Sequence, residues 1–195
     1  DGNWSPSSNK ETYEVIKPAT EEVLGNASKA TPADVDRALK SAEKGLAIWR
    51  KTPPWQRAYT LRKIADMVRE KKDVLAKWMT LENGKPLAEG VGETNGAADI
   101  FEWNAEETKR IYGQIVESRF EDTRVHVYYQ PIGVVAALSP WNFPLVLAAR
   151  KISTALAAGC SVIIKPDTIT PGVVMELVDI CRECGIPAGV VNLLS

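Results

Sequence analysis

The stretch GVVAALSPWNFPLVLAARKISTALAAGCSVIIKP, residues 133–166, decides the fold of this chain. It consists of an apolar run, a segment with helical spacing and a second apolar run. After it come a further helical segment and a third apolar run, GVVNLLS (189–195). Continuous apolar strands that alternate with helices are typical of parallel strands buried on both faces. We therefore predict an α/β protein in which residues 133–195 form the start of a doubly wound parallel nucleotide-binding sheet.

The residues before this stretch predict a hairpin and long helices. In TYEVIKPATEEVLGNASKA (12–30), two β-favouring runs flank a turn at 18–20, as in a hairpin. A capping box of Thr31 and Asp34 begins a helix, and Pro53-Pro54 ends it and begins the next. A third, long amphipathic helix is expected from Leu87 to Tyr112. The apolar face expected for the first helix consists of Val35, Ala38, Leu39, Ala42, Leu46 and Trp49.

The segment RVHVYYQ (124–130) alternates between apolar and polar residues and predicts a half-exposed strand. Its histidine, His126, has no catalytic partner nearby in sequence, which favours a surface or interface residue. We divide the chain into residues 1–113 (hairpin and helices), 114–132 (a strand segment for oligomerisation) and 133–195 (the sheet).

Composition excludes several classes of partner. There are 24 basic and 25 acidic residues without a block of like charge, so neither nucleic acid nor an anionic membrane is the expected partner. No apolar run approaches the roughly 20 residues that span a bilayer, and no secretion signal is visible. Cys160, Cys181 and Cys184 are too few for a disulfide framework, and we interpret the last two as ordinary thiols one helical turn apart, not as a metal site. We predict a soluble, cytoplasmic protein.

Two polar residues should meet at the edge of the sheet where ligands bind. Asn142 follows the first strand, before a helix that begins at Pro144, and Lys165 ends the second strand, so both should lie at the carboxyl edge. The Asn142 amide can donate to a developing oxyanion, or it can simply cap the helix. Lys165 can bind a ribose or phosphate, or can be a solvated strand end. A glycine-rich G-x-G-x-x-G turn for a pyrophosphate is missing from the first strand–helix connection.

Residues 131–166 resemble the aldehyde dehydrogenase superfamily, because proline, tryptophan, asparagine and the later lysine fall at its spacing. The resemblance extends through MTLENGKPLAEGVGE (79–93) and EWNAEETKRIYG (102–113), which are most similar to the succinate-semialdehyde dehydrogenase branch. It implies NAD(P)-dependent oxidation of an aldehyde, in particular a carboxylate-bearing semialdehyde, through a cysteine thiohemiacetal and hydride transfer. It also implies a homo-oligomer formed through the strand that contains His126.

The same resemblance implies a role for nine residues. Asn142 would supply the oxyanion amide and would lie with Trp141 along the nicotinamide half of the cofactor. Lys165 would contact the adenosine ribose. The remaining cofactor-binding residues are Leu138, Ser139 and Pro140 on the first loop and Pro166, Asp167 and Thr168 on the second.

Two departures from the family pattern qualify these expectations. Many members carry a glutamate where this chain has Thr168, and a hydroxyl beside Lys165 can donate to a 2′-phosphate that a carboxylate would repel. We therefore expect NADP as cofactor, with NAD possible because Asp167 can restore the negative charge. Family members are more than twice as long, with the cysteine nucleophile and glutamate base beyond the matched segment. We expect no turnover from a 195-residue polypeptide alone, and the alternative function is an inert nucleotide-binding or scaffolding fragment.

Overall fold

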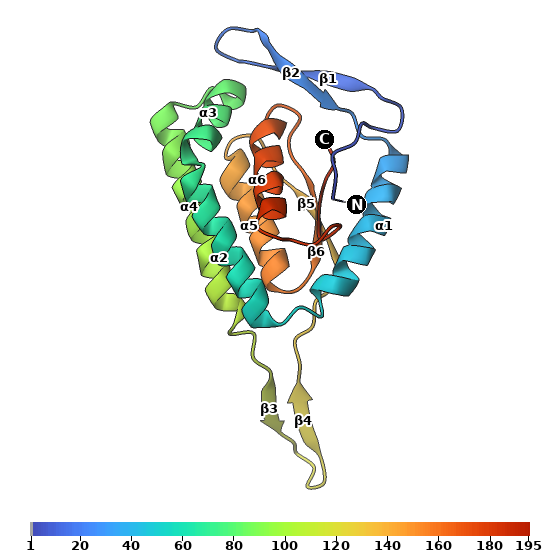
Figure 1. Cartoon of the computed structure of the whole chain (residues 1–195). Coiled ribbons are helices and arrows are strands. Elements are labelled where there is room, and N and C mark those ends of the chain that lie inside the picture. The colour runs from blue at the N-terminus through green and yellow to red at the C-terminus, as the bar shows by residue number, and fades with distance from the viewer. Residues whose placement is uncertain (1) are drawn as a thin grey trace.

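A computed structural model describes residues 2–195 of the chain (Figure 1). The helices and strands follow in the order β1 (Thr12–Ile16), β2 (Val23–Ser28), α1 (Pro32–Trp49), α2 (Pro54–Glu70), α3 (Lys72–Asn83), α4 (Leu87–Thr108), β3 (Gln114–Glu117), β4 (Arg124–Val127), β5 (Val134–Leu138), α5 (Pro144–Ala157), β6 (Ser161–Lys165), α6 (Pro171–Glu183) and β7 (Val191–Leu193).

The three C-terminal strands form a parallel sheet in the order β5-β6-β7. Strand β6 is central and fully apolar between its ends, so its two faces need two separate covers. Ile163 packs against Ala38 and Ala42 of α1, whereas Val162 and Ile164 belong to the large core shared with α5 and α6. The predicted α/β class and buried parallel sheet are confirmed, with α1 supplying the cover on the second face.

Helices α2, α3 and α4 form an outer layer against α5 and α6 (Figure 1). Phe101 of α4 and Leu61 of α2 are both fully buried in the same core as Leu145 of α5. The layers are therefore α1, the sheet, the pair α5 and α6, and the outer helices. This stacking brings the turn between α3 and α4 against the loops of the sheet.

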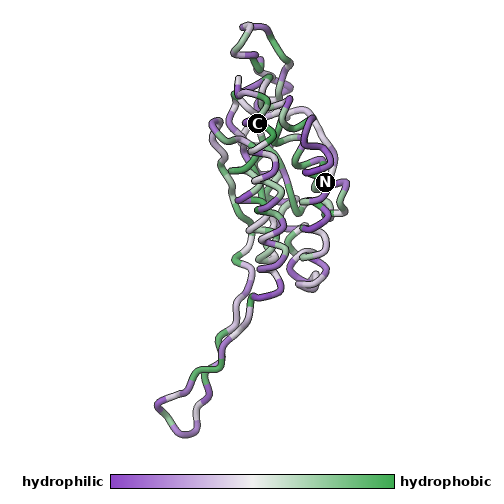
Figure 2. Tube along the Cα trace, turned by 90° about the vertical axis from the view of Figure 1, so that its left-hand side faces the viewer, coloured by the Kyte–Doolittle hydropathy of each residue, from purple (hydrophilic) through white to green (hydrophobic). Residues whose placement is uncertain are grey.

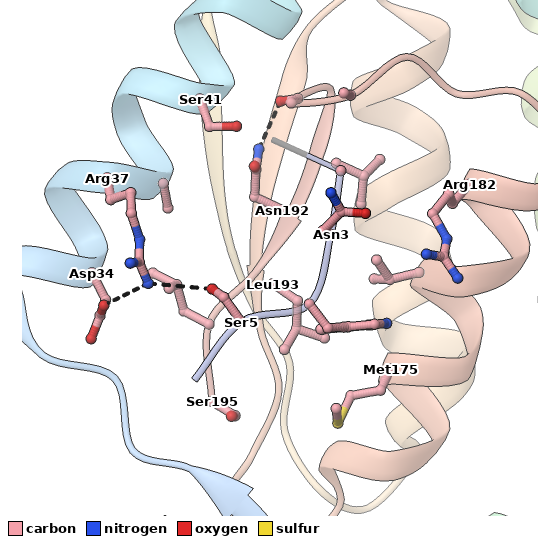
Figure 3. Close-up of a pocket in the computed structure, with 18 of the residues that line it drawn as sticks. Asn3, Ser5, Asp34, Arg37, Ser41, Met175, Arg182, Asn192, Leu193 and Ser195 are labelled. Carbon is pink, nitrogen blue, oxygen red and sulfur yellow. Dashed lines mark hydrogen bonds and ion pairs between the residues drawn. The ribbon is translucent and has the colours of Figure 1, made fainter. Parts of the chain in front are cut away.

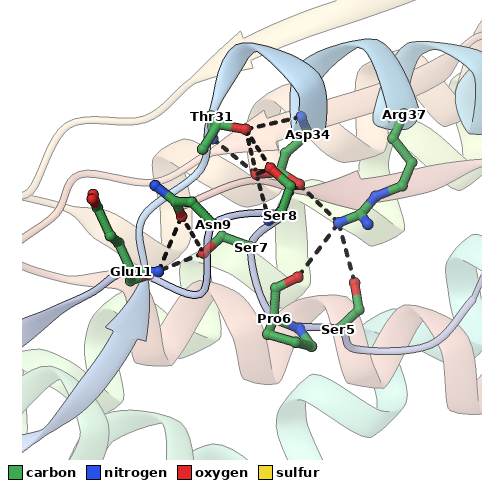
Figure 4. A network of polar contacts seen from close by, with 9 residues as sticks. All are labelled: Ser5, Pro6, Ser7, Ser8, Asn9, Glu11, Thr31, Asp34 and Arg37. Carbon is green, nitrogen blue, oxygen red and sulfur yellow. Dashed lines mark hydrogen bonds and ion pairs between the residues drawn. The ribbon is translucent and has the colours of Figure 1, made fainter.

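Helix α1 begins as predicted. The Thr31 hydroxyl accepts from the Asp34 N–H, and the Asp34 carboxylate accepts from the Thr31 N–H at 2.9 Å. The same carboxylate accepts from the Ser8 N–H and from Arg37, and so ties the N-terminal segment to the helix (Figure 4). The backbone N–H of Thr31 is the main reason that the pKa of Asp34 is lowered to about 2.

The predicted apolar face of α1 was partly wrong. Val35 and Leu39 are 42% and 41% exposed, whereas Ala38, Ala42 and Trp49 are buried as predicted. The other buried positions of α1 are Asp34, Ser41 and Gly45, so most of its buried residues are small or polar. Small side chains are needed because α1 lies directly on backbone. A Cβ at Gly45 would stand 2.2 Å from the carbonyl carbon of Gly189.

Two further predictions needed correction. The long helix ends at Thr108 instead of Tyr112, because the Lys109 and Arg110 N–H groups bond three residues back and tighten the last turn. The strand predicted over 124–130 ends at Val127, and it is exposed on both faces because β3 and β4 form a hairpin that projects away from the rest of the molecule (Figures 1 and 2). His126 is exposed there, as predicted, and stacks on Tyr128.

Candidate active site

The parallel register places the two predicted loops side by side. Leu138 at the end of β5 is the register partner of Lys165 at the end of β6. The Ser139 N–H extends this pairing by donating to the Lys165 carbonyl oxygen at 3.0 Å. The loop that carries Asn142 and the loop that carries Thr168 therefore leave the sheet from adjacent strands at its carboxyl edge.

Asn142 does not cap helix α5. The N-cap residue is Phe143, without a side-chain capping bond, and the α5 N–H groups of Leu145 and Val146 donate to the Glu93 carboxylate of α4, at 2.9 and 3.1 Å. Asn142 is exposed, and its side-chain amide has no hydrogen-bond partner among residues 2–195. The capping alternative is therefore excluded for this structure, and the amide is free to donate to a ligand.

The backbone of this loop is held by the turn between α3 and α4. Asn83 Nδ2 donates to the Trp141 carbonyl oxygen at 2.9 Å, and Lys85 Nζ donates to the Asn142 carbonyl oxygen at 3.0 Å. Lys85 is only 8% exposed and is paired with the buried Glu93. Trp141 and Phe143 remain about half exposed, at 51% and 50%.

A second buried carboxylate caps the next helix. Both oxygens of Glu82, the residue before Asn83, accept backbone N–H groups of α6, from Gly172 and from Val173, each at 2.8 Å. Glu82 is fully buried, and burial raises its pKa to about 7, against the lowering effect of the two N–H donors. Both helix N-termini at the carboxyl edge are thus already occupied by carboxylates. A cofactor pyrophosphate would not find free N–H donors in the first turn of α5.

The second loop leaves its lysine available. Lys165 is exposed, and its ammonium donates only to the neighbouring Pro166 carbonyl, at 3.3 Å, among the described residues. Asp167 is half-buried, and its carboxylate accepts from the Ile169 N–H at 3.1 Å, so part of its hydrogen-bonding capacity is used within the loop. Thr168 is exposed beside them, whereas Pro166 is buried.

These groups fit one part of a dinucleotide. An exposed ammonium and an exposed hydroxyl on one short loop suit a ribose or its phosphate. On the other loop, the Ser139 hydroxyl is buried and has no partner within residues 2–195, while Leu138 and Pro140 are exposed beside it. The nine predicted residues are therefore divided between two neighbouring loops at one edge of the sheet.

The three cysteines are unsuited to nucleophilic attack in this structure. All are free and buried, and burial raises the pKa of both Cys181 and Cys184, which keeps these thiols protonated. No group of three or more metal-ligating side chains occurs in the described part of the chain. None of the helices within residues 2–195 is long and apolar enough to cross a membrane.

A cavity of about 900 Å³ lies elsewhere, beside β7 and between α1 and α6 (Figure 3). Its lining includes Asp34, Arg37, Ser41, Met175 and Asn192. None of the nine predicted site residues is among its described lining residues, so the candidate site is an open edge of the sheet and not this cavity.

Sequence reasoning missed the residues that support the site. Glu82, Asn83, Lys85 and Glu93 lie within MTLENGKPLAEGVGE, which contributed to the resemblance but received no role. Their contacts span about fifty to ninety positions of sequence, so no local pattern reveals them. The only available signal was the unusual run of polar residues around a helix-breaking Gly-Lys-Pro.

Comparison with known proteins identifies the family. The model described as "Aldehyde dehydrogenase family" matches residues 4–195. The chain therefore belongs to the aldehyde dehydrogenase family.

Individual relatives are semialdehyde dehydrogenases. The chain is 44% identical to a glutarate-semialdehyde dehydrogenase of Pseudomonas putida and 42% identical to the succinate-semialdehyde dehydrogenase [NADP(+)] GabD of Escherichia coli, covering 100% of this chain and 40% of each relative. A crystal structure of succinate-semialdehyde dehydrogenase from Burkholderia pseudomallei superposes with a TM-score of 0.98 at 40% identity, over 100% of this chain and 40% of that one. The chain thus spans about 40% of the length of the relatives it matches.

Proposed function

We propose that the full-length protein containing this chain oxidises an aldehyde, in particular a semialdehyde with a carboxylate, to the acid. Family membership and the semialdehyde dehydrogenase names of the relatives support the reaction class. The observation that carries the role of this chain is the free Asn142 amide at the carboxyl edge, on the loop next to Lys165.

In this proposal, Asn142 donates an N–H to the aldehyde oxygen as that oxygen gains negative charge during nucleophilic attack. A fixed donor in this role lowers the barrier because it stabilises the transition state more than the neutral carbonyl. The nicotinamide cofactor, when bound, accepts the hydride. None of the three buried cysteines is suited to be the nucleophile, so a polypeptide of these 195 residues should not oxidise aldehydes by itself.

Lys165 and Thr168 would orient the adenosine ribose of the cofactor, with Pro166 and Asp167 shaping the loop. An ammonium beside a hydroxyl favours a 2′-phosphate, so we propose NADP as the preferred cofactor, with NAD also accepted. The Escherichia coli relative is named as an NADP(+) enzyme, which supports this preference.

Residues 114–132 are proposed as an oligomerisation arm between copies of the protein. The arm and the residues beside it expose large apolar side chains, including Ile115 at 77% and Ile132 at 90%. Light scattering of the full-length protein should give a multiple of the protomer mass, and a monomer at micromolar concentration would contradict this part of the proposal.

The test of the catalytic role is Asn142→Ala in the full-length protein. Loss of an oxyanion donor should lower kcat by about 10²–10³ with little change in the KM for cofactor. Asn26→Ala, which removes an exposed amide on β2 that has no hydrogen-bond partner among residues 2–195, is the matched control and should keep wild-type activity. A fall in kcat of less than about threefold for Asn142→Ala would reject the oxyanion role.

The competing function is an inert nucleotide-binding or scaffolding protein. The full-length protein would then be stabilised by NADP against unfolding but would not turn over a semialdehyde. Measurement of NADPH formation by absorbance, beside thermal unfolding with and without NADP, separates the two functions.

A further inference from the structure

The backbone of the loop that carries Asn142, and of the helix start that follows it, is held by hydrogen bonds from residues of the α3–α4 turn and of α4. Lys85 Nζ donates to the carbonyl oxygen of Asn142 itself at 3.0 Å, and Asn83 Nδ2 donates to the preceding carbonyl, of Trp141, at 2.9 Å. Two consecutive carbonyl groups are thus fixed by side chains that are more than fifty positions away in sequence.

Lys85 is the centre of this arrangement. Its ammonium is paired with the Glu93 carboxylate, donates to Asn142 and lies 4.1 Å from the centroid of the Phe143 ring. The lysine side chain is 7% exposed and that of Glu93 is 1% exposed, so water does not compete for these contacts.

Glu93 connects this arrangement to the first turn of α5. While one of its oxygens is paired with Lys85, the other accepts the N–H groups of Leu145 and Val146 in the first turn of α5. A cation therefore holds a carbonyl on one side of Pro144, and an anion holds N–H groups on the other. The pair fixes both the position of the loop and its direction into the helix.

The Asn142 side chain itself is not restrained by a hydrogen bond within residues 2–195 and is exposed. Its direction therefore depends on the backbone from which it projects. An oxyanion donor acts only if it is already aimed at the place where charge develops, because reorientation during the reaction would cancel the gain.

We propose that Lys85 is a positioning residue for the Asn142 amide, with Glu93 and Asn83 as its supports. This inference rests on the proposed oxyanion role of Asn142. Lys85 itself does not contact substrate: it acts through the Asn142 carbonyl and the loop backbone.

The test is a double-mutant cycle of Lys85→Met and Asn142→Ala in the full-length protein, measured by steady-state kinetics with NADP and succinate semialdehyde. Lys85→Met keeps the length of the side chain but removes the charge and the donor. It should lower kcat by about tenfold or more, with KM values changed less than about threefold. In the Asn142→Ala background the same change should have almost no effect, since no amide is left to position.

Controls separate positioning from general loss of structure. Lys71→Met breaks the partly exposed pair with Glu183, 2.8 Å apart, and should leave kcat unchanged. Asn83→Ala removes only the hydrogen bond to the Trp141 carbonyl and should lower kcat by about threefold. If the Lys85→Met variant does not fold, Asn83→Ala takes its place in the double-mutant cycle.

The outcomes are distinguishable. If Asn142→Ala alone has little effect, the proposed function fails, and the inference fails with it. If Asn142→Ala lowers kcat strongly but Lys85→Met, or Asn83→Ala in its place, lowers kcat equally in both backgrounds, the supporting residues act only on folding and the positioning role is overturned.

Discussion

Glu82 should make the stability of this chain fall as the pH rises from about 4.5 to about 7. The carboxylate is fully buried beneath α6 and accepts two backbone N–H groups. Burial raises its pKa from 4.5 to about 7, so the folded state binds a proton over a pH range in which the unfolded state has released it.

The sign follows from this difference in proton binding. Below pH 4.5 both states are protonated, and the folded chain has its full stability with respect to this group. Between 4.5 and about 7 the unfolded state gains an advantage that reaches about 3 kcal/mol, from about 1.4 kcal/mol per unit of pKa difference. Asp34, whose pKa is lowered, loses its contribution only below 3.8, outside this window.

Glu82→Gln is the appropriate perturbation because glutamine resembles the protonated acid at every pH. Urea unfolding of the wild-type and Glu82→Gln chains from about pH 4 to pH 8 measures the difference in the free energy of unfolding. We expect wild type to lose about 3 kcal/mol relative to the variant across this range. Glu22→Gln, at an exposed carboxylate whose pKa is lowered by its hydrogen bond to Lys17, is the control and should show no such trend above pH 5.

A difference that stays flat or rises with pH would refute this reasoning. Glu82 would then be ionised throughout, and the attraction of its charge to the α6 N-terminus and to the two N–H donors would outweigh the desolvation.

Two further predictions concern packing and cofactor choice. Gly45→Ala should destabilise the chain by about 3 kcal/mol in urea unfolding, because its Cβ would stand 2.2 Å from the backbone of Gly189, whereas Gly92→Ala, with nothing within 4 Å of the new Cβ, should be neutral or stabilising. Thr168→Glu should lower kcat/KM with NADP by about tenfold or more in the full-length protein while sparing NAD, and equal losses with both cofactors would contradict a 2′-phosphate contact.

Much of the fold follows from local patterns. The capping box at Thr31, the hairpin turn and the alternation of apolar runs with helices each depend on neighbouring residues, and each is found where the sequence predicts it. The predictions from sequence were wrong where the exposure of a residue depends on elements that are distant in the chain. The residues of β4 have the composition of a half-buried strand, yet all of them except Val127 are exposed.

For the candidate site, too, some features follow from the sequence and others do not. The sequence by itself determined that Asn142 follows one parallel strand and that Lys165 ends the next, because strand and helix lengths set which residues reach the carboxyl edge. It left open whether Asn142 caps α5, since an asparagine before a proline suits both roles.

Only the tertiary structure decided that question. Glu93 caps α5, and Lys85 holds the Asn142 carbonyl, through contacts that exist only once the outer helices pack on the sheet. The physical reason is that a buried charge must be paired and a buried N–H must be satisfied, but the sequence does not state which distant side chain will do so.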